Sequence, residues 1–272
     1  MASLFERILL ATEHTDFDAV AESLALDLAS RCSVPLRAVL PMIRNLEYEI
    51  ASPDLAGRQA EDFSRKAADL RKQAARAGVI LETAVKPCEA LHRGILEEAR
   101  SFGASLLVAR RRGRQGFLSN LLVGEMVSKV AAEAPCTMLF APANARPWNR
   151  GALVALDPAA PGEGIIRAAL EVAASCKLAL NFMAVTEQPS QAGMLLERAC
   201  QEAQARGITA SSHRAAGSPA EQILAHAAAL PADVILVGRE RGGRFLKSAF
   251  GSTSRKIIGL ADCAVLLVKA TE

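Results

Sequence analysis

The chain has 272 residues, of which 51% are hydrophobic and 22% charged, and its formal net charge is +3. This length suits one large domain or two of moderate size, and the apolar fraction is enough for well-filled cores. No apolar run reaches the roughly 18 residues that a membrane span requires, and no signal peptide is recognised at the start. We therefore expect a folded cytoplasmic protein with no membrane partner, and the slight charge predicts no nucleic-acid partner.

The first half alternates short apolar runs with amphipathic segments. We expect strands at 8–11, 36–40, 79–85, 105–109 and 137–140, and helices at about 16–31, 57–77, 89–102 and 124–133. The first helix places Val20, Leu24 and Leu28 on one stripe, and Thr15 or Asp16 can cap it. Strands that are apolar on both faces and alternate with helices predict a parallel sheet covered by helices on both sides.

The second half repeats the first, as "ILLATEHTD" answered by "ALVALDPAA" illustrates. Three constant offsets of 144, 129 and 127 residues fix the register, through the pairs Glu13/Asp157 and Cys32/Cys176, Ala109/Gly238, and Gly124/Gly251. The repeat predicts an α/β protein of two tandem doubly wound, Rossmann-like domains, at 1–144 and 150–272, with a linker at about 141–150. The apolar fifth strands would otherwise leave exposed edges, so we expect an internal pseudo-dimer, and a homodimer stays open.

Cysteine and histidine residues give no sign of a metal site or a disulfide scaffold. The six cysteines form no CxxC pair, and the four histidines show no HExxH motif. We interpret His14 as a solvated loop residue, with a place in a cleft as the alternative. The run Arg110–Arg114 lacks interleaved aromatic residues, so we interpret it as a solvated loop, with phosphate or RNA binding as the alternative.

The segment "VGRERGGRFLKSAFGSTSRKI", residues 237–257, carries the clearest functional signal. Gly238 ends a predicted strand and residues 251–253 open a helix, whose free N–H groups attract anions. Glycine lets phosphate oxygens approach the main chain, the hydroxyls can donate hydrogen bonds, and Arg239, Arg241 or Arg244 can supply charge. The pattern predicts a phosphate site, with a plain glycine-rich turn and a Ser/Thr helix cap as the alternative.

The order of these motifs resembles the universal stress protein family over nearly the whole chain. The motifs are ALVALD ending at 157, GSPAEQIL at 217–224, ADVILVG at 232–238, FGS at 250–252 and ADCAVLLVK at 261–269. The resemblance implies a five-stranded parallel sheet in each domain, an adenine nucleotide alpha hydrolase-like architecture, and pairing of two domains through their last strands. In one branch of the family it also implies ATP or AMP bound by the pattern G-x2-G-x9-G-[ST].

Carried over by position, the resemblance implies a nucleotide site in the second domain. Its residues are Asp157, Val185, Val237, Gly238, Arg239, Gly242, Gly251, Ser252 and Thr253. The family's second glycine position holds Arg241 here, with Gly242 one place later. No general base or set of magnesium carboxylates is evident beyond Asp157, so we predict a nucleotide-binding regulatory protein with no catalytic residues. The alternatives are a slow ATP-hydrolysing enzyme of the same architecture and a ligand-free scaffold for protein partners.

The first domain departs further from the pattern. Glu13 replaces the aspartate, Ala109 replaces the first glycine, and Gly124 is followed by Glu125 instead of serine. A carboxylate beside a helix N-terminus can occupy the anion position itself and repel phosphate. We therefore expect a degenerate site in the first domain and one nucleotide per chain, in the second.

Overall fold

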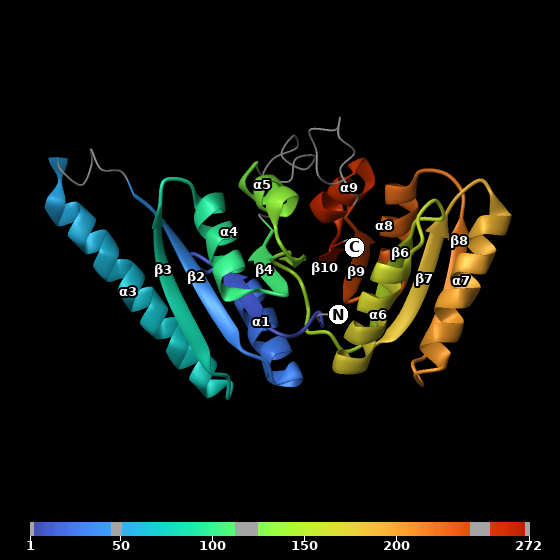
Figure 1. Ribbon diagram of the computed structural model, residues 1–272, viewed down its shortest axis with the longest axis horizontal. Helices are drawn as coiled ribbons and strands as arrows, with labels where there is room; N and C mark the ends of the chain where they lie inside the picture. Colours follow the sequence, from blue (N-terminus) through green and yellow to red (C-terminus); the bar gives the residue numbers. More distant parts are fainter. Residues whose placement is uncertain (1–2, 45–50, 112–124, 240–250, 270–272) are drawn as a thin grey trace. The chain divides into compact units, whose positions relative to one another are not determined.

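The structure is a computed structural model that describes residues 3–44, 51–111, 125–239 and 251–269 (Figure 1). The chain divides into two compact units. Unit 1 comprises Met1–Arg110 with Gly124–Cys136, and unit 2 comprises Arg111–Val123 with Thr137–Glu272. The strand at 137–140 that we expected to close the first repeat is therefore grouped with unit 2.

Unit 1 begins the alternation of strands and helices. In chain order its described elements are β1 (Ile8–Ala11), α1 (Ala19–Cys32), β2 (Leu36–Ile43), α3 (Pro53–Arg76), β3 (Leu81–Cys88), α4 (Leu91–Phe102), β4 (Leu106–Arg110) and α5 (Glu125–Glu133). The strands lie in the order β3-β2-β1-β4 and pair in parallel. The strand order therefore reverses between β1 and β4.

Unit 2 repeats this arrangement. Its described elements are β5 (Thr137–Ala141), β6 (Gly151–Leu156), α6 (Glu163–Cys176), β7 (Ala179–Val185), α7 (Pro189–Gln204), β8 (Ala210–Ala215), α8 (Pro219–Ala229), β9 (Val234–Gly238), α9 (Ser252–Leu260) and β10 (Ala264–Val268). The strand order is β5-β10-β9-β6-β7-β8, parallel except for β5, which pairs antiparallel with β10. The order reverses between β6 and β9, and the predicted doubly wound α/β fold is confirmed.

Several bounds of the predicted elements differ from the structure. We expected the third strand at 79–85, but β3 runs to Cys88 because β2 continues to Ile43 and pairs with it. Pro87 is tolerated there because β3 is the edge strand of unit 1 and lacks a second partner within that unit. The expected caps of α1 were also wrong, since the residue before the helix is Asp18.

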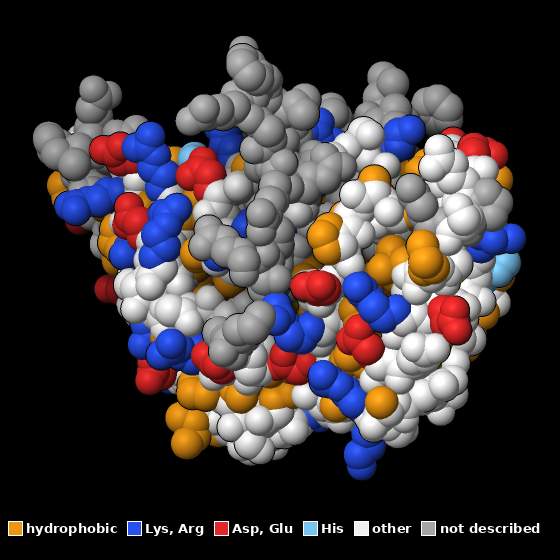
Figure 2. Space-filling view, turned by 45° about the vertical axis from the view of Figure 1, so that its right-hand side comes forward, with side chains coloured by type: hydrophobic (Ala, Val, Ile, Leu, Met, Phe, Trp, Pro, Cys, Tyr) orange, Lys and Arg blue, Asp and Glu red, His pale blue; other side chains and the backbone are white. Residues whose placement is uncertain are grey.

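The strands are buried because they are apolar on both faces. Every residue of β1, β5 and β10 is buried, and helices such as α1 and α6 cover the sheets with stripes of alanine, leucine and valine. On the face drawn in Figure 2, Lys and Arg side chains lie interspersed with those of Asp and Glu. In the described part of the chain, no helix combines the length and the apolar character needed to cross a membrane.

Candidate functional site

A cavity of about 290 Å³ lies in unit 2 where the strand order reverses between β6 and β9. Open parallel sheets bind ligands at such a reversal, outside the carboxyl ends of their strands. We call this cavity the switch-point pocket. It is lined by Ala155, Leu156, Asp157, Pro158, Ala160, Gly162, Ile165, Val185, Pro219, Ile223, Val237, Gly238, Arg239, Thr253, Ser254 and Ile257.

Most of the residues predicted from the sequence to bind a ligand meet in this pocket. Those in the lining are Asp157, Val185, Val237, Gly238, Arg239 and Thr253. Gly251 and Ser252 come directly before Thr253, as the N-cap and the first residue of α9, but they do not line the cavity. Gly242 and Arg241 lie outside the described residues. The structure thus gathers residues that are almost a hundred positions apart in the sequence.

Asp157 stands at the end of β6 with a fixed orientation. Its Oδ1 accepts a hydrogen bond of 2.9 Å from the Ala159 N–H, and its main-chain carbonyl accepts one of 3.0 Å from the Ala160 N–H. Within the described residues, no other hydrogen bond or ion pair engages this carboxylate. The second oxygen is therefore available to accept a hydrogen bond from a ligand.

Three helices point their N-termini at the switch-point pocket. Gly162 precedes α6, Pro219 is the first residue of α8, and Thr253 lies in the first turn of α9. None of these three described helix starts has a side-chain cap hydrogen bond. Because first-turn N–H groups lack intrahelical partners and the helix dipole is positive at this end, all three favour an anion. Arg239 adds a full positive charge.

Part of the lining of the switch-point pocket is apolar. Its branched side chains, from the five elements α6, β7, α8, β9 and α9, are Ile165, Val185, Ile223, Val237 and Ile257. A flat apolar ring system would bury its faces against such branched side chains, while an attached anionic group reaches the helix N-termini. The cavity thus suits a ligand that is apolar at one end and anionic at the other.

Sequence reasoning missed Gly162 and Ser254. Gly162 has a φ of 72°, which favours glycine, and a Cβ placed there would lie only 3.0 Å from Leu195 Cδ1. Glycine therefore allows the backbone turn before α6 and avoids a close contact with Leu195. Ser254 is buried, and its hydroxyl donates a hydrogen bond of 3.2 Å to the Gly238 carbonyl, which ties α9 to the end of β9. The sequence "GSTS" offered Ser254 as a third hydroxyl, but nothing in it indicated burial.

The corresponding place in unit 1 holds a cluster of paired charges. Arg110, at the end of β4, places its Nε 2.8 Å from Asp18 Oδ1 and its Nη2 3.4 Å from Glu13 Oε2. Asp18 is only 1% exposed, and its Oδ2 also accepts hydrogen bonds from the Thr15 N–H (3.0 Å) and hydroxyl (2.6 Å). The interpretation of Arg110 as a solvated loop residue was wrong, because a buried carboxylate holds it.

A second carboxylate is buried beside this ion pair. Glu22 is 2% exposed, accepts a hydrogen bond of 2.7 Å from the Thr12 hydroxyl, and lies 3.0 Å from His14 Nδ1. His14 has a φ of 50°, an unusual conformation for a residue other than glycine, which turns its ring toward Glu22. The interpretation of His14 as a solvated residue was therefore also wrong.

The repeat register shows that the two regions are counterparts. At the offset of 144 residues, Thr12, Glu13, Asp18 and Glu22 correspond to Leu156, Asp157, Gly162 and Ile166, and at 129 residues Arg110 corresponds to Arg239. At three of these four positions, unit 1 has a polar or acidic residue where unit 2 has an apolar residue or glycine. We call Thr12, Glu13, His14, Asp18, Glu22 and Arg110 the ion-paired cluster.

The described parts of the chain contain no cluster of metal-binding side chains. Among residues 3–44, 51–111, 125–239 and 251–269, no three His, Cys, Asp or Glu side chains are grouped so as to hold an ion. The cysteines are free thiols.

Comparison with known proteins identifies both halves with one family. The model described as "Universal stress protein family" matches residues 4–142 and 164–269. Two curated Bacillus subtilis (strain 168) proteins are similar over short stretches. Universal stress protein YxiE is 35% identical over 75 residues, which is 28% of this chain and 51% of that protein, and stress response protein NhaX is 43% identical over 53 residues, 20% and 32%. The matches thus span about half of one relative and a third of the other.

Solved structures share the fold over nearly the full chain. A universal stress protein from Archaeoglobus fulgidus DSM 4304 superposes with a TM-score of 0.77 at 18% identity, covering 98% of this chain and 97% of that one. The functionally unknown protein PA1789 from Pseudomonas aeruginosa PAO1 gives a TM-score of 0.69 at 21% identity, covering 97% and 92%. At these identities the likeness shows the fold alone.

Proposed function

Because this chain belongs to the universal stress protein family, and is thus a stress-response protein, we propose that its switch-point pocket binds an adenine nucleotide, ATP or AMP. The observation that carries the proposal is the convergence of three helix N-termini and Arg239 on one cavity with an apolar wall. The phosphates lie at the start of α9, near Gly251, Ser252 and Thr253. The adenine packs between the valine side chains, and Asp157 accepts a hydrogen bond from the base or ribose.

The proposed role is regulatory: the bound nucleotide changes what the protein contacts, and it is not consumed quickly. Phosphoryl transfer needs a positioned nucleophile and charge-neutralising groups in addition to a phosphate cradle. Asp157 carries the one carboxylate in the described lining of the pocket, and the Ala159 N–H already holds it. A metal-dependent turnover above about 1 s⁻¹, within the ordinary enzyme range, would favour the alternative of an ATP-hydrolysing enzyme.

A charge placed in the first turn of α9 tests the nucleotide site. Thr253→Glu sets a carboxylate in the pocket lining while adding a favourable charge to the helix N-terminus, so the fold is expected to keep its stability. Repulsion between this carboxylate and the phosphates should weaken ATP binding by about a hundredfold or more. Titration calorimetry with ATP and with AMP measures the affinity and the number of sites.

Unit 1 supplies the matched control. At the offset of 127 residues Met126 corresponds to Thr253, so Met126→Glu adds the same charge at the same place in α5. We expect one site per chain in the wild type and unchanged binding in Met126→Glu. Two equivalent sites in the wild type would overturn the proposal. So would a variant pair in which Met126→Glu loses ATP binding and Thr253→Glu keeps it. An absence of ATP and AMP binding would favour the ligand-free scaffold.

We also propose that the two repeats form an internal pseudo-dimer through their fifth strands. Its support is the antiparallel register in which Leu139 lies opposite Leu266, since β5 comes from the first repeat and β10 from the second. Cysteines at these two positions should form a bond within one chain, identified by mass spectrometry of the linked peptides. A bond that joins two chains instead would indicate a homodimer.

A further inference from the structure

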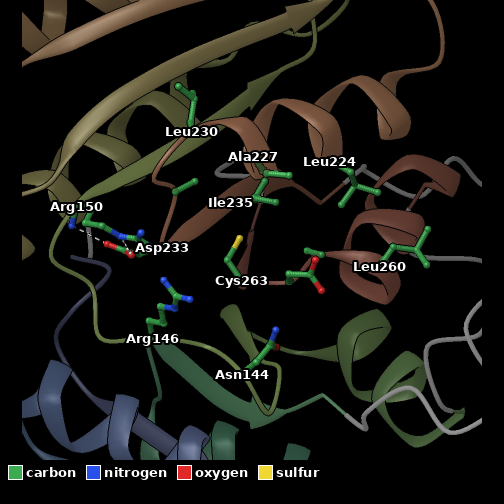
Figure 3. A pocket seen from close by; sticks show the side chains of 14 residues that line it. Asn144, Arg146, Arg150, Leu224, Ala227, Leu230, Asp233, Ile235, Leu260 and Cys263 are labelled. Carbon is green, nitrogen blue, oxygen red and sulfur yellow. Dashed lines mark hydrogen bonds and ion pairs between the residues drawn. The ribbon is translucent and has the colours of Figure 1, made fainter.

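A second cavity, of about 390 Å³, lies at the other end of the unit 2 sheet, where β6, β9 and β10 begin (Figure 3). Arg150, Asp233 and Cys263 each stand one residue before one of these strands and line it. We call this cavity the amino-end pocket. Its full lining is Asn144, Arg146, Arg150, Leu224, Ala227, Ala228, Leu230, Ala232, Asp233, Ile235, Leu260, Ala261, Asp262 and Cys263.

Arg150 and Asp233 hold each other and are not free for a ligand. Arg150 Nε donates a hydrogen bond of 2.9 Å to Asp233 Oδ1, and Asp233 Oδ2 accepts hydrogen bonds from the N–H groups of Asn149 (2.8 Å) and Arg150 (2.6 Å). The Asp233 side chain is 0% exposed, so this pair anchors the linker to the start of β9. The opposite charges of Arg150 and Asp233 therefore neutralise each other.

Arg146 and Asp262 bring charges of opposite sign that do not neutralise each other. Both line the amino-end pocket, yet in the described part of the chain neither has a hydrogen bond or an ion pair. Figure 3 shows the Arg146 side chain extending from the linker toward Asp233 and Cys263. Burial raises the pKa of the Cys263 thiol to about 11, so this side chain stays neutral near pH 7. Arg146 and Asp262 therefore supply the charge that a ligand would meet.

Helix polarity distinguishes this pocket from the first. α8 and α9 direct their N-termini at the switch-point pocket and end at Ala229 and Leu260, beside the amino-end pocket. A helix C-terminus is the negative end of the dipole, and its last carbonyls lack intrahelical donors. A cationic or donor group is thus favoured near Asp262, and a phosphate is disfavoured. Leu224 and Ile235 add an apolar wall beside it.

We propose that the amino-end pocket binds a small zwitterion with an apolar body, of the apolar α-amino acid class. The carboxylate pairs with Arg146, the ammonium group pairs with Asp262 and the helix C-termini, and the side chain packs on Leu224 and Ile235. Each of these three ligand groups thus has its own partner in the pocket. A molecule that lacks the carboxylate, the ammonium group or the apolar body leaves one part of the pocket without a partner. This site is separate from the proposed nucleotide site, since the two cavities share no lining residue.

Titration calorimetry of the full chain with L-leucine tests the proposal. We expect one site per chain with a dissociation constant of about 1 mM or tighter. N-acetyl-leucine lacks the ammonium group, isoamylamine lacks the carboxylate and glycine lacks the apolar body, so each should bind at least about tenfold more weakly. Arg146→Gln and Asp262→Asn should each weaken leucine binding by about tenfold or more.

Arg206→Gln is the matched control, because Arg206 is also exposed but lies just after α7, outside the pocket lining. ATP titrations of the same variants should match the wild type, so a failed nucleotide site and a failed amino-acid site give different results. No saturable heat with leucine, or isoamylamine or N-acetyl-leucine binding as tightly as leucine, would overturn the proposal. Equal leucine affinity in wild type, Arg146→Gln and Asp262→Asn would do the same.

Discussion

The ion-paired cluster of unit 1 and the switch-point pocket of unit 2 occupy the same place in two copies of one fold. In unit 2, Gly162 leaves space before α6 and Arg239 lines a cavity. In unit 1, Asp18 stands at the position of that glycine, and Arg110 is bound to its carboxylate. The comparison teaches that one backbone plan can place the equivalent arginine either in the lining of a cavity or against the protein's own carboxylates.

The difference also changes what each region contributes to stability. A buried ion pair costs desolvation, and it is tolerated only when hydrogen bonds satisfy its remaining atoms. Asp18 meets this condition with two donors from Thr15, and Glu22 with donors from Thr12 and His14. The buried carboxylates of the cluster are thus satisfied by donors within unit 1, whereas the corresponding place in unit 2 has glycine and apolar residues at three of the same positions.

The largest expected effect comes from breaking the cluster at Arg110. Arg110→Met leaves the buried Asp18 carboxylate without its countercharge and should lower the free energy of unfolding by about 3 kcal/mol. Urea denaturation followed by circular dichroism measures the change. Arg239→Met is the matched substitution in unit 2, where Gly162 stands at the position of Asp18. An equal loss of stability in both variants would contradict the special contribution of the Arg110–Asp18 ion pair.

Replacing Glu22 should have a smaller effect. Glu22→Ile introduces the residue of unit 2 and leaves the Thr12 hydroxyl and the His14 ring without their acceptor, at a cost of about 2 kcal/mol. Adding Thr12→Leu, again the residue of unit 2, removes the orphaned hydroxyl but also removes the oxygen that accepts a 2.8 Å hydrogen bond from the His14 N–H, so the double variant should recover none of that loss in the same urea assay. A double variant that is more stable than Glu22→Ile would contradict the account of the cluster as a hydrogen-bonded unit.

The smallest effect is expected from acid, and it should arise in unit 2. His14 of unit 1 faces a carboxylate, whereas His226 of α8 stacks on His213 of β8 with ring centroids 4.3 Å apart. Burial, and then the charge of His213, lower the pKa of His226. The unfolded chain therefore takes up a proton at higher pH than the folded chain, so stability is complete above about pH 6.5 and falls as the pH drops below it.

Two variants separate the causes of this acid sensitivity. His226→Phe keeps an aromatic ring against His213 but cannot titrate, so thermal unfolding between pH 7 and pH 5 should depend less on pH than in the wild type. His213→Phe removes the repulsion but leaves His226 partly buried, so it should reduce the dependence by a smaller amount. A steeper fall with acid in His226→Phe would mean that another group governs the response.

The sequence predicted the elements well because apolar alternation and the repeat both report on the sheet. Of the six predicted residues that line the switch-point pocket, Gly238, Arg239 and Thr253 follow from local signals, the strand end and the "GST" helix start, whereas the family resemblance implied Asp157, Val185 and Val237. The sequence did not predict Gly162, Pro219 or Ile223, since these join the pocket only when three helices converge. It also missed the ion-paired cluster, because the pairing of Arg110 with Asp18 spans most of unit 1 and depends on strand order.

Strand β5 precedes the linker in the sequence but pairs with β10, which follows it. A protease that cuts anywhere in 142–150 would therefore sever the backbone without freeing the second repeat, because Met138, Leu139 and Phe140 stay hydrogen-bonded to their partners on β10. A fragment of residues 150–272 produced alone would instead present one edge of β10, "AVLLV", to solvent. Such an apolar edge pairs readily with another chain, so the isolated fragment should associate unless a peptide carrying residues 137–141 is supplied with it.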